Sequence, residues 1–168
     1  MSSSLPRNAQ QVIRTGGFDL PCDADTAFPL FSPEGERQWA PGWNPIAVYP
    51  ETIAFTTNTV FRLGQGSEES IWTILEADSQ THRAEYVRVA PASHTARIRV
   101  NVEPVSPNRS HVIVSYAVTA FGEHASTVLE PFSEGVYAQR MREWQQQISE
   151  CLGMVSPRTS DRRRGMER

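Results

Sequence analysis

The chain has 168 residues, a formal net charge of −3 and a sequence pI near 5.8, with acidic and basic residues mixed along it. This length suits one domain that buries about 70% of the surface its unfolded chain would expose. The charge gives no broad positive field, which argues against nucleic acid as a partner. All 16 basic residues are arginine, so lysine chemistry such as Schiff-base formation is excluded.

The N-terminal segment and the two cysteines indicate the expected subcellular location. Residues 1–10 are polar and show no periodic pattern, so we expect a flexible lead with no signal peptide. No run of about 18 apolar residues follows, which predicts a cytoplasmic protein without a membrane span. Cys22 and Cys151 are too few for a disulfide framework and lack metal-ligand spacing. We therefore expect two buried thiols, no metal and no cofactor.

The chain then predicts one strand followed by two short helical segments. Residues 12–20 form a β-prone run, in which the Gly16-Gly17 pair suggests a bulge. Asp23 is placed to cap a short helix, which Pro29 keeps short or kinked. Residues 32–45, SPEGERQWAPGWNP, are interrupted so often by proline and glycine that only one or two helical turns fit.

From residue 46 to residue 121 the chain repeats short β-prone runs at hairpin spacing. They are IAVY, TVFRL, SIWTILEAD, HRAEYVRV, TARIRVNVEPV and SHVIVSYAVTAF. The breaks between them are too short for crossover helices and therefore predict an antiparallel meander. Over 96–103 apolar and polar residues alternate strictly, which indicates that one face of the sheet is buried.

The last element changes to a helical period. Its apolar stripe recurs at three- and four-residue steps through Leu129, Phe132, Val136, Tyr137, Met141, Trp144, Ile148, Cys151 and Leu152. Thr127 and Glu130 resemble a capping box, Pro131 is tolerable only near the first turn, and Gly153 is placed to end the helix. This predicts one long amphipathic helix, followed over 154–168 by a disordered Arg-rich tail.

This order of elements predicts an α+β domain over residues 11–153. The long helix must bury its apolar stripe against the apolar face of the sheet. A strongly curved antiparallel sheet wrapped around one helix leaves a gap, because the helix covers only a strip of the concave surface. A small molecule would occupy that gap.

Two stretches carry a family resemblance in addition to the element order. FPLFSPEGERQWAPGWNP resembles the helix-and-loop segment of bacterial members of the START-like (SRPBCC) superfamily, and VIVSYAVTAF with VYAQRMREW resembles their last strand and gripping helix. The resemblance implies the helix-grip fold, with a curved seven-stranded antiparallel sheet around the C-terminal helix. Members of that superfamily include lipid-transfer proteins, Bet v 1-like carriers of hydrophobic ligands and polyketide aromatase/cyclases, so the resemblance leaves carrier and enzyme both open.

Aromatic residues on the facing elements are the first candidates for ligand contact. Trp72, Tyr86, Tyr116, Tyr137 and Trp144 lie on elements whose apolar faces should meet across the cavity, and Met141 shares the helical stripe. Tyrosine hydroxyls need a partner when buried and can orient a ligand carbonyl or hydroxyl. The alternative is that these side chains simply fill the core. Our predicted ligand contacts are Trp72, Tyr86, Arg88, Tyr116, Tyr137 and Met141.

Arg88 poses a question that the alternation leaves open. In HRAEYVRV it shares a face with Ala84 and Tyr86, while the other face carries Val87 and Val89. If Tyr86 points inward, Arg88 does too, and its guanidinium is placed to bind a ligand carboxylate or enolate. If it points outward, Arg88 is a solvated strand residue.

Charged residues and tryptophans crowd the loop before the meander. Glu34 and Glu36, two residues apart, suggest acid/base work, but we favour a structural role in which they cap backbone amides. Trp39 and Trp43 would close one end of the core.

Three functions follow, in order of preference. The first is a carrier or sensor of a small lipid-, sterol- or polyketide-like ligand. The second is an aromatase/cyclase-like enzyme in which Arg88 and a tyrosine stabilise an enolate. The third is a chaperone-partner domain, in which the gripping helix or the Arg-rich tail presents the binding surface. A small apolar molecule is the expected partner, and a homodimer is left open.

Overall fold

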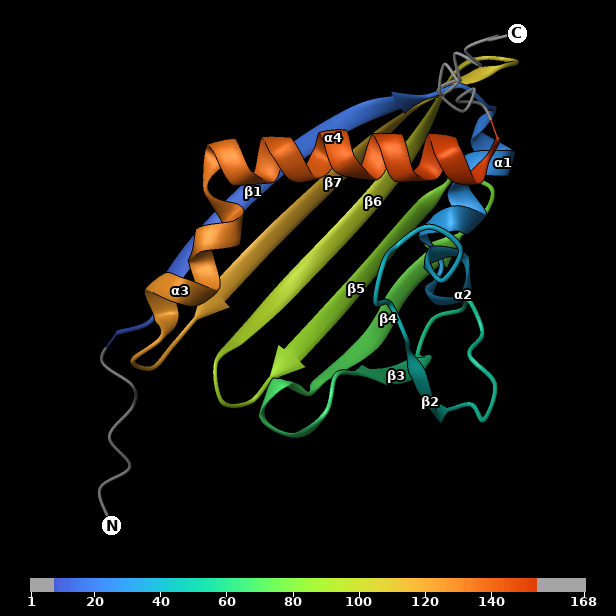
Figure 1. Ribbon diagram of the computed structural model, residues 1–168. Coiled ribbons are helices and arrows are strands. Elements are labelled where there is room, and N and C mark those ends of the chain that lie inside the picture. Colours follow the sequence, from blue (N-terminus) through green and yellow to red (C-terminus); the bar gives the residue numbers. More distant parts are fainter. Residues whose placement is uncertain (1–7, 154–168) are drawn as a thin grey trace, which may run out of the picture.

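The computed structural model describes residues 8–153 and contains one antiparallel sheet of seven strands. Their order is β1-β7-β6-β5-β4-β3-β2, so that strands β2 to β7 form a meander and β1 joins it beside β7 (Figure 1). The strands are β1 (Gln10–Leu20), β2 (Ile46–Tyr49), β3 (Val60–Leu63), β4 (Ser70–Asp78), β5 (Arg83–Ala90), β6 (His94–Ser106) and β7 (Arg109–Ala120). The predicted α+β fold with a seven-stranded curved sheet is confirmed.

Short helices connect the strands, and one long helix crosses the sheet. They are α1 (Ala24–Ala27), the 3₁₀ helix η1 (Phe28–Phe31), α2 (Pro33–Glu36), η2 (Gly66–Glu68), α3 (Ala125–Leu129), η3 (Glu130–Phe132) and α4 (Glu134–Cys151). In Figure 1, α4 crosses β1, β7 and β6, while β5 to β2 extend beyond it. Among the helices of residues 8–153, none is long and apolar enough to cross a membrane.

The glycine pair in β1 forms no bulge, and its first member, Gly16, faces α4. Residues of β1 pair with β7 in unbroken register from Gln10 to Leu20, so the bulge expected at Gly16-Gly17 is wrong. A Cβ atom on Gly16 would lie 2.9 Å from Met141 Cγ and 2.9 Å from Tyr137 Cε1. Glycine at this position therefore lets α4 approach β1 closely.

The C-terminal helical segment is broken where the sequence predicted one continuous helix. Pro131 lies in η3, and α4 begins only after Ser133, whose extended backbone (φ −61°, ψ 153°) separates the two helices. Neither α3 nor α4 receives a hydrogen bond from a capping side chain, so the predicted Thr127–Glu130 capping box is wrong. Gly153, with φ 68°, follows the end of α4 as predicted.

The core lies between the inner face of the sheet and α4. On β6 the predicted alternation holds, since Ala96, Ile98, Val100 and Val102 are buried, and they belong to the same core as Ile148 of α4. Cys22 is buried as expected. Cys151 is exposed, which corrects the expectation of two buried thiols, because the last turn of α4 turns this side chain away from the sheet.

Candidate functional site

A cavity of about 610 Å³ lies between the sheet, α4 and the segment that follows α2. It forms because α4 packs closely against β1 at Gly16, at one side of the sheet, and leaves the inner face of β4 and β5 uncovered by the helix (Figure 1). Cavities that bind small molecules in proteins usually enclose about 300–1,000 Å³. The gap predicted from the order of elements is therefore present and large enough for a ligand.

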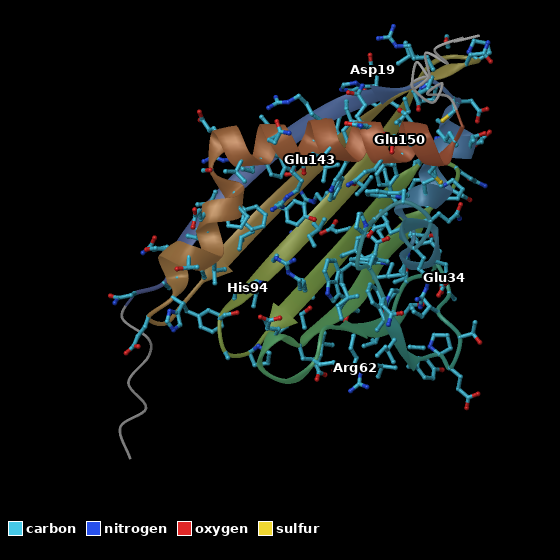
Figure 2. All side chains as sticks on the ribbon, viewed as in Figure 1. Asp19, Glu34, Arg62, His94, Glu143 and Glu150 are labelled. Carbon is cyan, nitrogen blue, oxygen red and sulfur yellow. The ribbon has the colours of Figure 1, made fainter. Side chains whose placement is uncertain are left out.

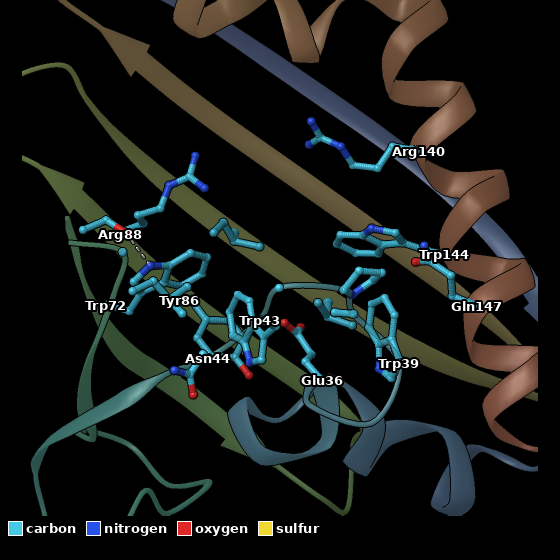
Figure 3. A pocket seen from close by; sticks show the side chains of 18 of the residues that line it. Glu36, Trp39, Trp43, Asn44, Trp72, Tyr86, Arg88, Arg140, Trp144 and Gln147 are labelled. Atoms are coloured by element: carbon cyan, nitrogen blue, oxygen red, sulfur yellow. Dashed lines mark hydrogen bonds between the residues drawn. The ribbon is translucent and has the colours of Figure 1, made fainter. Parts of the chain in front are cut away.

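All four tryptophans of the chain line this one cavity (Figure 3). Trp72 comes from β4, Trp144 from α4, and Trp39 and Trp43 from the segment after α2. The rings contact one another edge to face, with centroids 5.4 Å apart for Trp39 and Trp144 and 5.5 Å apart for Trp43 and Trp72. The walls are thus flat, apolar and polarisable, which suits an apolar or aromatic ligand.

Hydrogen bonds fix three of these indole rings. Trp39 Nε1 donates to the Leu30 carbonyl at 2.7 Å, and Trp43 Nε1 donates to the Pro33 carbonyl at 2.8 Å. Trp72 Nε1 donates to Ser70 Oγ at 3.0 Å. Trp39 and Trp43 therefore close one end of the core, as predicted, and also form a wall of the cavity.

The helix α2 that carries these tryptophans into place is held by Ser32. Its hydroxyl accepts a hydrogen bond from the Gly35 backbone N–H at 2.9 Å and donates to the Pro29 carbonyl at 2.7 Å. A Cβ atom on Gly35 would lie 2.0 Å from the Pro29 carbonyl oxygen, so the turn closes only around glycine. Arg37 secures the following segment by donating to Asn44 Oδ1 at 2.8 Å.

Arg88 points into the cavity, which answers the question that the sequence left open. It follows Tyr86 on the inner face of β5 and lies opposite Trp72 of β4, with its Cζ atom 5.3 Å from the centroid of the Trp72 ring. Its Nε is buried and has no hydrogen-bond partner among residues 8–153. Burial and the positive charge of Arg140 lower the pKa of Arg88, against the opposite influence of Tyr116.

Arg140 is a cavity residue that the sequence analysis did not single out. It reaches into the cavity from α4, and its Cζ atom lies 5.0 Å from the centroid of the Phe132 ring. Figure 3 shows the guanidinium groups of Arg88 and Arg140 extending toward one another. The available signal was spacing, because Arg140 is three residues after Tyr137 and four before Trp144, on the same side of the helix.

Glu36, like Glu143 of α4, is an acidic residue that lines the cavity. Its carboxyl points into the cavity near Trp39 and Trp43 (Figure 3), and in the described part of the chain it has no ion-pair partner. The residue is only half-buried because part of its surface lines the cavity, but burial of the carboxyl raises its pKa well above the ordinary value. The structural capping role expected for it is wrong, since Ser32 caps α2, while Glu34 pairs with Arg37 at 2.9 Å.

The three tyrosines chosen as polar ligand contacts have different surroundings. Tyr86 and Tyr116 line the cavity, whereas Tyr137 lies on α4 against Gly16. The Tyr86 hydroxyl donates to the Phe31 carbonyl at 2.6 Å, and the Tyr137 hydroxyl donates to the Val114 carbonyl at 2.7 Å. The Tyr116 hydroxyl has no hydrogen-bond partner within residues 8–153, so it is the one most able to donate to a ligand.

The six predicted ligand contacts divide between two hollows. Trp72, Tyr86, Arg88 and Tyr116 come together in the tryptophan-lined cavity. Tyr137 and Met141 line a separate hollow of about 520 Å³ between β1 and α4. The sequence predicts that five of the six point inward, leaves the direction of Arg88 open, and does not reveal that α4 packs off-centre, which separates Tyr137 and Met141 from the others.

His94 lies at the start of β6 (Figure 2) and is not among the residues that line the cavity. Its Nδ1 shares a hydrogen bond with Ser93 Oγ at 2.7 Å, and its Nε2 is buried without a partner in the described residues. Burial and the neighbouring charge of Arg88 lower the pKa of His94, which favours its neutral form.

A curved antiparallel sheet gripping a long C-terminal helix, with a cavity between them, defines the START-like helix-grip fold. The chain has this fold, as the sequence resemblance implied. No protein-family model and no curated protein matches the sequence.

Solved structures place the fold among known ones. A protein from Thermobifida fusca aligns with a TM-score of 0.63 at 16% identity, over 83% of this chain and 94% of that chain. Norcoclaurine synthase from Thalictrum flavum, in complex with dopamine and hydroxybenzaldehyde, aligns with a TM-score of 0.57 at 12% identity, over 89% and 91%. A START superfamily protein from Mycobacterium smegmatis aligns with a TM-score of 0.59 at 11% identity, over 86% and 99%. At such identities the likeness establishes the fold alone.

Proposed function

We propose that this protein binds a small hydrophobic ligand in the tryptophan-lined cavity and acts as its carrier or sensor. The observation that carries the proposal is the convergence of all four tryptophans on one cavity of about 610 Å³. A chain that merely filled its core would close such a space, because protein interiors pack to the density of organic crystals. Lipid-, sterol- and polyketide-like molecules are the ligand classes considered.

The structural neighbours support ligand binding in general terms. Norcoclaurine synthase, with the same fold, has been crystallised with two small aromatic molecules, dopamine and hydroxybenzaldehyde. That protein is an enzyme, so the fold is compatible with binding and with turnover alike.

The first test is native mass spectrometry of protein purified without detergent, followed by solvent extraction and identification of any co-purifying molecule. We expect a stoichiometric adduct. Replacing Ile98, which lines the cavity, by tryptophan should fill the space and abolish the adduct. Val105→Trp adds the same side chain to an exposed position of the same strand and should leave binding intact. Equal adducts in both variants would refute binding in this cavity.

Glu36, Tyr116 and Arg88 favour a second candidate function, an aromatase/cyclase-like enzyme. All three line one cavity, in which Glu36 can donate a proton to a ligand carbonyl while Arg88 stabilises an enolate. Turnover of a poly-β-ketone by the wild-type protein, lost in Arg88→Ala and in Glu36→Gln with folding intact, is the expected result for an enzyme. Turnover that survives both substitutions would remove this mechanism.

Other sequence-based expectations stay predictions. The Arg-rich tail at 154–168 lies outside the described residues, and deleting 156–168 is the test of a chaperone-partner role. If the truncated protein retains all partner binding, the tail is not the binding surface. Cytoplasmic location and a homodimer are likewise predictions, which cell fractionation and light scattering would check.

A further inference from the structure

Six of the ten arginines within residues 8–153 have a carboxylate partner, and Arg88 and Arg140 are among the four that do not. Six arginines within residues 8–153 form ion pairs with glutamate or aspartate: Arg14, Arg37, Arg62, Arg97, Arg99 and Arg109. In that same part of the chain, neither Arg88 nor Arg140 is in an ion pair. Both face the tryptophan-lined cavity, so two cations lie near each other there, and neither forms an ion pair with an acidic residue of the described chain.

Neither acidic residue of the cavity is paired with its two guanidinium groups. The ionisable residues other than tyrosine that line the cavity are Arg88, Arg140, Glu36 and Glu143. Glu143 is an exposed residue of α4, labelled in Figure 2. Within residues 8–153, neither Glu36 nor Glu143 forms an ion pair with either arginine. A monoanionic group on the ligand would supply one shared partner for both guanidinium groups.

We propose that the cavity is built for an aromatic carboxylate, whose acid group lies between Arg88 and Arg140 and whose ring system lies among the four tryptophans. This inference rests on the proposed function and names its ligand class. Arginine forms paired N–H bonds to the two oxygens of a carboxylate, and this planar geometry gives orientation as well as affinity.

The position of Arg88 supports this arrangement. Its Nε is buried, so the two Nη groups are the atoms that reach the cavity. The guanidinium lies over the Trp72 ring, which restricts its motion before a ligand arrives. Arg140 approaches from the opposite wall on α4 and is likewise placed over an aromatic ring, that of Phe132. Two restrained guanidinium groups that face each other form a clamp for one anion.

Matched naphthalene probes test the head group separately from the aromatic body. Isothermal titration calorimetry at pH 7, after solvent extraction of any bound molecule, would compare 2-naphthoic acid, 2-naphthalenemethanol and 2-naphthyl phosphate. We expect the carboxylate to bind at least about tenfold more tightly than the alcohol, the size of one or two charge-assisted hydrogen bonds. We also expect it to bind more tightly than the phosphate, because the second negative charge of the phosphate costs more to bury.

Variants then assign the preference to the two arginines. Arg88→Gln and Arg140→Gln should each remove most of the carboxylate preference, while the affinity for the alcohol stays within about twofold. Arg99→Gln, on the outer face of β6 and paired with Glu85, is the matched control and should behave as wild type. Thermal unfolding of each variant confirms that the fold is retained.

Each alternative result of these titrations contradicts a specific part of the proposal. Equal affinity for acid and alcohol would overturn the carboxylate clamp and leave the proposed function standing. A tighter phosphate would overturn the monoanion class. Binding of none of the three probes would overturn the aromatic carboxylate class, and an adduct seen by native mass spectrometry would then still support a hydrophobic ligand of another kind.

Discussion

The Glu36 carboxyl lies in surroundings that oppose its ionisation. Burial raises its pKa well above the ordinary value of 4.5, so the folded chain retains a proton that the unfolded chain releases. The free energy of unfolding therefore decreases as pH rises from about 4.5 toward the raised pKa, by at most about 1.4 kcal/mol per pH unit. Below pH 4.5 both states hold the proton, and this contribution is constant.

Glu36→Gln should remove this pH dependence, because glutamine does not ionise. Urea unfolding at pH 5 and pH 8 would measure it, and we expect the variant to gain stability relative to wild type at pH 8. Glu34→Gln, two residues away, changes an exposed carboxylate paired with Arg37 and is the matched control. If wild type and Glu36→Gln lose equal stability between the two pH values, the desolvated carboxyl has been assigned wrongly.

The direction of Arg88 shows where sequence reasoning stops at the scale of one residue. Ala84 and Tyr86 on one face of β5, and Val87 and Val89 on the other, are all apolar enough to be buried. The register of β5 against β4 decides which face of β5 points inward, because it places Arg88 opposite the buried Trp72. Register depends on contacts distant in sequence, which an alternation confined to one strand does not contain.

Close packing of α4 on β1 positions the cavity at the scale of elements. Gly16→Ala would place a Cβ atom 2.9 Å from both Met141 Cγ and Tyr137 Cε1, so α4 or β1 must shift. We expect a loss of about 1–3 kcal/mol in the free energy of unfolding, measured by urea denaturation. Gly135→Ala on α4 has nothing within 4 Å of the added atom and should instead raise stability by up to about 1 kcal/mol.

A double-mutant cycle distinguishes crowding from other effects of the Gly16 substitution. Met141→Ala removes one of the crowded atoms, so its combination with Gly16→Ala should cost less than the sum of the two single changes. Strict additivity would mean that the glycine is needed for a reason other than the approach of α4.

The starts of α2 and α4 predict different outcomes for the same substitution. Ser32 accepts a hydrogen bond from the Gly35 N–H, whereas Ser133 makes no capping bond to α4. We expect Ser32→Ala to cost about 1 kcal/mol in urea unfolding and Ser133→Ala to cost less than about 0.5 kcal/mol. Equal costs would show that the Ser32 cap contributes little to the position of α2.

Helices and strands could be predicted where the sequence signal lies within or beside the element itself. Hairpin spacing and alternation predict the six strands of the meander within a residue or two, and Asp23 and Pro29 set the start and end of α1. The break at Ser133 was not predicted, because the apolar stripe continues through it from Leu129 to Tyr137 at helical spacing. The bend depends on packing of α3 and α4 against different parts of the sheet, which the stripe does not encode.

For the molecule as a whole, the cavity should cost stability in the absence of a ligand. A space of about 610 Å³ forfeits the contacts that a filled core would make, and the two guanidinium groups that face it form no ion pair within residues 8–153. Sites that are prepared for a ligand commonly carry such costs, which binding then offsets. The arrangement is therefore better explained by a bound partner than by the stability of the free chain.

Arg88→Met puts that explanation to a test, because it keeps an unbranched apolar side chain over Trp72 and removes the charge. We expect the free protein to gain about 1 kcal/mol in the free energy of unfolding, measured by urea denaturation at pH 7. Arg99→Met, on the outer face of β6 where Arg99 pairs with Glu85, should bring no such gain. With saturating 2-naphthoic acid the order should reverse, since only the wild type gains the full free energy of carboxylate binding. A variant that is less stable than wild type without ligand would show that Arg88 is held there for its stacking on Trp72, and its charge would then need no anion.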